Sequence, residues 1–171
     1  MKHVIRLLVV CMLFCLSACQ QKKETLFIEK DGKLYEVFDQ VSFYYPETFT
    51  ADVSSYSENT IRFVKNEELL SYTSYLDSID NSVEEMAALY EGHLQQGGAS
   101  DILYSAVKLD SGNKCYDFTG KYLATGIKFR YIVCFAQDTT YIYGYQAPMD
   151  AYEDNIDVIG KYLESLTVHY E

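Results

Sequence analysis

The chain lacks the short motifs by which many enzymes and metal proteins are recognised. It has three histidines, none in a His-x-x-x-His spacing, and its five cysteines include no Cys-x-x-Cys pair. No Gly-x-Ser-x-Gly elbow is present to hold a serine nucleophile, and no glycine-rich loop opens a helix to bind phosphate. We therefore predict no catalytic residues, no metal site and no cofactor.

Positive charge is also scarce. The chain has 14 Lys and Arg against 25 Asp and Glu, a formal net charge of −11. Loss of Lys2 and Arg6 with the leader described below would make this −13. Such a chain repels nucleic acid and anionic headgroups, so we expect no nucleic-acid partner. The acidic residues are spread along the chain with hydrophobic residues between them, which indicates a solvated surface rather than a disordered acidic tail.

Tryptophan is absent, whereas 17 tyrosines are present. Tyrosine suits strands and half-buried positions, where its ring packs and its hydroxyl reaches a polar partner. Cross-strand aromatic packing explains most of this set without a ligand. The exposed part of the set could still form a recognition surface on a sheet.

The only long apolar run lies at the N-terminus. Residues 7–16 are uninterruptedly apolar, follow Lys2 and Arg6, and precede the small residues Ser17 and Ala18. This order is typical of a secretory signal. Ten residues are too few for a transmembrane helix, which needs about 20.

Leu16-Ser17-Ala18-Cys19 resembles the lipobox of bacterial lipoproteins. The resemblance implies that residues 1–18 are a signal peptide, that Cys19 becomes the acylated N-terminus, and that 19–25 form a polar tether. Two or more acyl chains, of the palmitate kind, anchor a protein stably. We therefore expect a lipid-anchored, extracytoplasmic protein on a cell membrane or an outer membrane, with the bilayer as one partner.

Hydrophobic alternation and turn residues predict a largely antiparallel sheet. Asp31-Gly32 is a residue pair typical of a type I′ turn and would join 26–30 and 33–37 as a hairpin. Turns at 110–113, 124–126 and 137–140 separate four strands that should form a meander. The predicted strands are 26–30, 33–37, 41–45, 61–64, 70–76, 102–109, 114–122, 128–136, 140–146 and a terminal edge strand at 166–170.

Two helices complete the pattern. Ser82 and Glu85 form a capping box, and Gly97-Gly98 ends the first helix. The second runs from about Asp150 to Glu164, with acidic residues in its first turn. We therefore predict one α+β domain over residues 26–171, an antiparallel sheet flanked by helices.

The two cysteines outside the leader and lipobox should face each other. In a hairpin centred between Ala124 and Thr125, the numbers of opposed residues add up to 249, and those of Cys115 and Cys134 do so. Opposed Cα atoms lie about 4.5–5.5 Å apart, which a disulfide can bridge. A pair of thiols in an oxidising compartment favours the disulfide, and two free buried thiols are the alternative.

The remaining candidate ligands form no recognisable site. His93 lies near the end of the first helix and His169 in the terminal strand, apart from each other in the sequence. Carboxylates that could in principle bind Ca²⁺ occur at Asp77, Asp80, Asp150, Glu153, Asp154 and Asp157. Their spacing fits no EF-hand loop, and helix capping and solvation explain them.

Three stretches resemble PsbP-like and DcrB-like domains. These are 43–49, a strand that runs into Pro46; 141–148, their penultimate strand; and Tyr152 with 164–168, their closing helix and last strand. The resemblance implies an antiparallel sheet sandwiched by helices and a mostly non-catalytic family. No functional residue of that family maps onto this sequence.

The sequence therefore favours a non-catalytic binding or scaffold module of the cell envelope, with an envelope protein as partner. An envelope hydrolase that uses carboxylates in a cleft is one alternative, and it requires a pocket with two or more carboxylates of raised pKa. A receptor for a small ligand or a cation is another.

Overall fold

The structure is a computed structural model that describes residues 28, 30–37, 40–57, 59–77, 82–136 and 138–169. Within these ranges the chain forms ten strands, two α-helices and one short 3-10 helix, η1 (Val53–Ser55). The predicted signal peptide (1–18), the lipidated Cys19 and the tether (19–25) lie outside the described residues.

Seven strands form an antiparallel sheet in the order β3-β4-β5-β9-β8-β7-β6. They are β3 (Thr50–Ala51), β4 (Thr60–Lys65), β5 (Glu68–Leu76), β6 (Ala99–Lys108), β7 (Lys114–Tyr122), β8 (Ile127–Ala136) and β9 (Thr139–Pro148). The predicted meander is confirmed, because β6 to β9 follow one another across the sheet. Strand β3 was missed because two residues are too few to show alternation.

Three further strands form a smaller antiparallel sheet in the order β1-β2-β10. They are β1 (Gly32–Val37), β2 (Val41–Pro46) and β10 (Thr167–Val168). Strand β10 lies at an edge, as predicted, although it is shorter than 166–170. A separate second sheet was not predicted, since nothing local in these strands shows which sheet they join.

The hairpin predicted at Asp31-Gly32 is wrong. Ile28, Lys30 and Asp31 have helical backbone, and β1 pairs with β2. A type I′ turn needs positive φ at both central residues, and neither residue has it. Gly32 is needed for close approach, because a Cβ there would lie 2.6 Å from the Ile28 carbonyl oxygen and 2.8 Å from the Tyr162 ring.

Both helices begin within a residue of their predicted start. Helix α2 (Val83–Gln96) has the predicted capping box: the Glu85 amide donates to Ser82 Oγ at 3.2 Å, and the Ser82 amide donates to Glu85 Oε2 at 2.8 Å. Helix α3 (Met149–Leu163) follows β9 directly. Pro148 precedes α3 without a side-chain cap, so packing rather than capping fixes where α3 begins.

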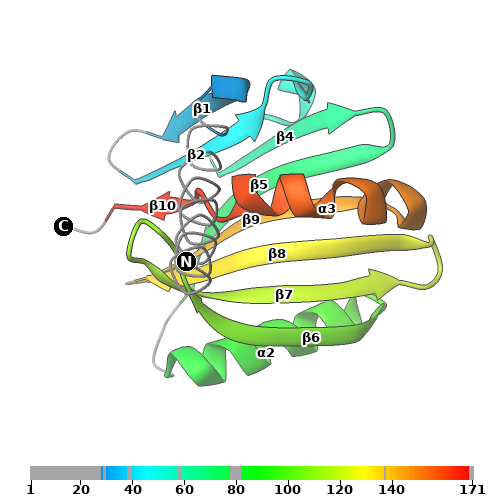
Figure 1. Cartoon of the computed structure of the whole chain (residues 1–171). Helices are drawn as coiled ribbons and strands as arrows, with labels where there is room; N and C mark the ends of the chain where they lie inside the picture. The colour runs from blue at the N-terminus through cyan, green and yellow to red at the C-terminus, as the bar shows by residue number, and fades with distance from the viewer. Residues whose placement is uncertain are drawn as a thin grey trace, which may run out of the picture.

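The helices lie on opposite faces of the large sheet (Figure 1). Helix α3 and the small sheet pack on one face, around a core that includes Phe43, Phe63 and Tyr143. Helix α2 packs on the other face, over Phe118, Tyr131 and the strands at the β6 side. The predicted α+β class is therefore confirmed, in the form of an antiparallel sheet flanked by helices.

The register of the β7–β8 hairpin is the one expected. Tyr116 faces Val133 and Phe118 faces Tyr131, so the opposed numbers add up to 249. A disulfide joins Cys115 and Cys134, whose Cα atoms are 4.2 Å apart. The bridge points toward the α3 side, in the larger core.

The turn between β6 and β7 holds the C-terminal strand through Asn113. Its Nδ2 donates to the Val168 carbonyl oxygen at 2.9 Å, and its Oδ1 accepts from the Val168 amide at 2.9 Å. The Ser111 hydroxyl donates to the same Oδ1 at 2.7 Å. The side-chain amide of Asn113 thus pairs with β10 as a neighbouring strand would.

Among the described residues, no helix is both long enough and apolar enough to cross a membrane.

Candidate binding cavity

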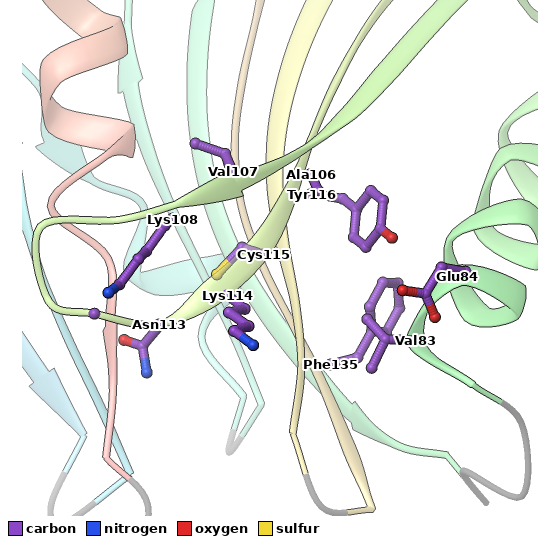
Figure 2. Close-up of a pocket in the computed structure, with 11 residues that line it drawn as sticks. Val83, Glu84, Ala106, Val107, Lys108, Asn113, Lys114, Cys115, Tyr116 and Phe135 are labelled. Carbon is purple, nitrogen blue, oxygen red and sulfur yellow. The ribbon is translucent and has the colours of Figure 1, made fainter.

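A cavity of about 710 Å³ opens at one end of the α2 side of the large sheet. Its wall is formed by the first turn of α2, by β6 and β7 on either side of their turn, and by the end of β8 (Figure 2). This volume lies within the range of about 300–1,000 Å³ that small-molecule sites occupy. The lining residues are Val83, Glu84, Ala106, Val107, Lys108, Gly112, Asn113, Lys114, Cys115, Tyr116 and Phe135.

Two lysines line one end of the cavity. Lys108 and Lys114 are directly opposed across β6 and β7, so both side chains leave the same face of the sheet. Neither makes an ion pair or hydrogen bond within the described part of the chain. Directly opposed like charges destabilise a strand pair, so this end of the cavity favours an anion.

A carboxylate lines the opposite end. Glu84 lies in the first turn of α2, and Figure 2 shows it near Tyr116 and Phe135, on the other side of the lining from Lys108. Its negative charge suits a helix N-terminus, which explains why it is tolerated there without an ion-pair partner. The cavity therefore has a positive end on the hairpin and a negative end on the helix.

The wall between the charged ends is mostly apolar. Ala106, Tyr116 and Phe135 come from three neighbouring strands, and Val83 comes from α2. Partial burial and then the charge of Glu84 raise the pKa of Tyr116 above its ordinary value of 10.0. The hydroxyl is therefore protonated at neutral pH, and it makes no hydrogen bond within the described structure.

Arg130 forms a second charged cluster, which is internally satisfied. Its Nε and Nη2 donate to both carboxylate oxygens of Asp117 at 2.8–3.1 Å, and Nη2 also donates to Glu164 Oε1 at 2.7 Å. The guanidinium lies against Gly160, where any side chain would overlap it. This cluster joins β7, β8 and α3, and its charged groups are paired with one another.

Glu68 is a buried carboxylate with both oxygens engaged. The Tyr145 hydroxyl donates to Oε2 at 2.6 Å, and Lys65 Nζ lies 2.9 Å from Oε1. The Glu68 side chain is 5% exposed. Because its partners are in place, it is not a free acid or base.

The candidate ligands named from the sequence do not meet in one site. His93 lies in the last turn of α2, and His169 follows β10, with its Nε2 3.2 Å from Ser42 Oγ. Asp150, Glu153, Asp154 and Asp157 lie exposed on α3, and Glu153 pairs with Lys128. The Asp77 amide donates to the Asp138 carbonyl oxygen, and Asp80 lies outside the described residues. No group of three metal-ligating side chains occurs within the described ranges.

Sequence reasoning missed the residues that line the cavity, although one signal was available. Lys108 and Lys114 lie close to either end of the predicted turn at 110–113, so the sequence places them near each other, although a loop centred on 110–113 would set Lys108 opposite Cys115 and the actual register is one residue different. Glu84 and Phe135 carried no such signal, because their approach depends on how α2 packs across the sheet.

Comparison with protein families finds no family model that matches this sequence, and comparison with curated proteins finds no matching relative. Solved structures match its fold. The cyanobacterial PsbP protein of Synechocystis sp. PCC 6803, CyanoP, has a TM-score of 0.62 at 16% identity, over 81% of this chain and 92% of its own.

Two other neighbours have a similar fold. The Ran-binding protein Mog1p of Saccharomyces cerevisiae has a TM-score of 0.53 at 12% identity, over 80% of this chain and 95% of its own. A protein of unknown function from Pseudomonas aeruginosa has a TM-score of 0.54 at 7% identity, over 78% and 94%. The PsbP-like fold expected from 43–49, 141–148 and Tyr152 with 164–168 is therefore confirmed, and at these identities the likeness concerns the fold alone.

Proposed function

We propose that this protein is a lipid-anchored, extracytoplasmic lipoprotein whose globular domain is a non-catalytic binding module. The cavity between α2 and the β6–β8 strands is its binding site. The observation that carries the proposal is the opposed, unpaired Lys108 and Lys114 at the mouth of a cavity of ligand size, in a strongly acidic chain.

The composition of the cavity supports binding over catalysis. Its wall has one carboxylate, two lysines and one tyrosine, and its cysteine is held in the disulfide with Cys134. The lining side chains therefore include no nucleophile beside a general base. The hydrolase alternative requires two carboxylates of raised pKa, whereas Glu84 is the one carboxylate that lines this cavity. Two smaller cavities formed by described residues are lined by one carboxylate each, Asp117 and Asp101.

The anchor is proposed from the N-terminal sequence. The leader at 1–18 and the lipobox that ends at Cys19 support export and acylation. One structural neighbour is described as a Ran-binding protein, so the fold is compatible with a binding role. A protein of the cell envelope is the proposed macromolecular partner.

Mass spectrometry of the native protein tests the anchor. We expect no peptide from residues 1–18 and an acylated Cys19 as the first residue. A Cys19→Ala variant should leave the membrane fraction. An intact Met1, or an unmodified thiol at position 19, would overturn the proposed anchor.

A cavity-filling variant tests the binding site. The protein is purified from its host, denatured, and its extract is searched by mass spectrometry for small molecules. We expect a compound that co-purifies with the natural protein and is lost from Ala106→Trp. Ser105→Trp adds the same bulk to the same strand on the other face of the sheet and should retain the compound. Identical extracts from the natural protein and Ala106→Trp would contradict binding in this cavity.

A further inference from the structure

The cavity presents opposite charges at its two ends, which restricts the chemistry of its ligand. Figure 2 shows Lys108 and Lys114 on the β6–β7 hairpin and Glu84 across from them on α2. A simple anion long enough to span the cavity would meet the lysines at one end and be repelled by Glu84 at the other. A simple cation of the same length would be attracted by Glu84 and repelled by the two lysines. A molecule with both charges matches both ends.

The charged groups are free to serve a ligand. No ion pair within the described part of the chain engages Lys108, Lys114 or Glu84. By contrast, three other lysines of this sheet are paired, Lys65 with Glu68, Lys121 with Asp101 and Lys128 with Glu153. A ligand carboxylate between the two opposed lysines would relieve their repulsion.

The wall between the ends suits apolar side chains joined by a polar link. Val83, Ala106 and Phe135 offer apolar surface on two sides of the cavity. The protonated Tyr116 hydroxyl lines the same cavity, on the side of Glu84, and is without a hydrogen-bond partner within the described residues. It can donate to a carbonyl oxygen at the middle of a ligand.

We propose that the cavity binds a short apolar peptide with free ends. Its carboxylate lies between Lys108 and Lys114, its ammonium group meets Glu84, and its side chains pack on Phe135 and Val83. This inference rests on the proposed function and names the ligand class of the same cavity. A short peptide fits within the range of ligand sizes that an open cavity of about 710 Å³ can hold.

Calorimetric titration of the full chain in detergent with three probes tests the ligand class. The probes are leucyl-phenylalanine, its N-acetyl derivative and its C-terminal amide. We expect the free dipeptide to bind, and each blocked form to bind at least about tenfold more weakly, because each has lost one of its two charges. Equal affinity for the free and the N-acetylated dipeptide would overturn the zwitterion proposal in favour of a simple anion.

Variants assign each end of the dipeptide to its side chain. In Glu84→Gln, N-acetylation should no longer weaken binding, whereas amidation still should. In the double variant Lys108→Gln, Lys114→Gln the reverse should hold. Comparing the free and the blocked dipeptide on the natural protein and on a variant forms a double-mutant cycle. The cycle isolates one interaction even when the substitution also lowers stability. Lys30→Gln with Lys33→Gln removes the same charge from exposed positions before and in β1, and should leave all three affinities unchanged. If blocking each end of the dipeptide weakens binding to the variants as much as to the natural protein, the assignment of the two ends to Glu84 and to the lysines is overturned.

Failure of this inference is distinguishable from failure of the proposed function. A compound that is lost from Ala106→Trp, but that the dipeptide neither resembles nor displaces, would leave the cavity as a binding site and overturn the peptide. An Ala106→Trp variant that binds the dipeptide as the natural protein does would overturn both.

Discussion

The two faces of the seven-stranded sheet differ in how completely they are covered. On the α3 face, the described residues form a core of twenty buried side chains, closed by α3 and the small sheet. On the α2 face the core has ten, and it lies mainly over β6 to β9. Beyond this core, β4 and β5 present Arg62, Val64 and Tyr75 to solvent on the α2 face.

Because of this difference, the α3 face supplies most of the stability of the fold, whereas the α2 face holds the proposed binding cavity. The disulfide lies in the core on the α3 face, called the closed core below. The hydrogen bonds between the Asn113 side-chain amide and Val168, called the Asn113 clasp below, tie the β6–β7 turn to the C-terminal strand β10, which borders this core. The cavity and its unpaired charges lie on the partly covered face. Unpaired like charges cost stability, and a fold tolerates them where another face supplies the stability. Substitutions on the two faces should therefore affect different measurements.

The largest expected effect is that of Phe43→Ala in the closed core. Phe43 is fully buried, stacks on Tyr143 at 4.3 Å between ring centroids, and lies 6.2 Å from Phe63. Removal of the ring should lower the free energy of unfolding by about 3–5 kcal/mol, measured by urea titration. Val64→Ala, on the exposed face of β4, should cost less than about 1 kcal/mol. Equal losses would contradict the contrast between the faces.

Loss of the disulfide should have the next largest effect. It closes a loop of about 20 residues, so replacing both Cys115 and Cys134 by Ala should lower the free energy of unfolding by about 3 kcal/mol. Dipeptide binding at saturating concentration should survive, because both cysteine side chains pack in the core on the α3 face and the charged groups assigned to the ligand are unchanged. Two free thiols in the denatured, unreduced protein would show that the bridge does not form.

Removal of the Asn113 clasp should cost about 2 kcal/mol, because it leaves the Val168 amide and carbonyl unpaired. Asn113→Ala should also speed hydrogen exchange at Val168 more than at Phe43. Asn113→Asp keeps the acceptor and loses the donor, so its cost should be smaller. Unchanged exchange at Val168 in Asn113→Ala would contradict a role for this side chain in holding β10.

The smallest expected effect is a gain. The Tyr72 hydroxyl is buried in the closed core and makes no hydrogen bond in the described structure, although Ser74 lies near it on the same face of β5. Tyr72→Phe removes this unsatisfied group and should raise the free energy of unfolding by about 1 kcal/mol at neutral pH. Tyr56→Phe, at an exposed ring, should change it by less than about 0.5 kcal/mol.

Alkaline pH sharpens the same test. Burial raises the pKa of Tyr72 to about 12, against 10.0 in the unfolded chain. Between these values the unfolded chain releases the proton and the native protein keeps it, so the stability that this proton contributes is present below pH 10 and is lost as the pH rises toward 12. Unfolding free energies measured across this range should fall less steeply in Tyr72→Phe. Identical slopes would contradict the raised pKa.

Much of the fold was predictable because its signals are local. Alternating strands and the turns at 110–113, 124–126 and 137–140 predicted the meander, and the turn centred between Ala124 and Thr125 predicted the β7–β8 register that places Cys115 opposite Cys134. The Ser82 and Glu85 capping box predicted the start of α2. The Asp31-Gly32 hairpin failed because Gly32 serves a close contact with Tyr162, which lies far away in the sequence.

The cavity was less predictable than the fold. The hairpin register alone brings Lys108 opposite Lys114, but nothing in the sequence indicates that a void lies beside them. A void depends on where α2 stops covering the sheet, and that is decided by how side chains such as Phe118 and Tyr90 pack.

The sequence by itself determined the class of the fold and the pairing of the four meander strands β6 to β9, because hydrophobic period, caps and turns act over a few residues. The tertiary structure alone decided that β1, β2 and β10 form a second sheet, and that Glu84 and the two lysines line the same cavity. These arrangements depend on contacts between residues far apart in the chain, and such contacts leave no periodic pattern in the sequence.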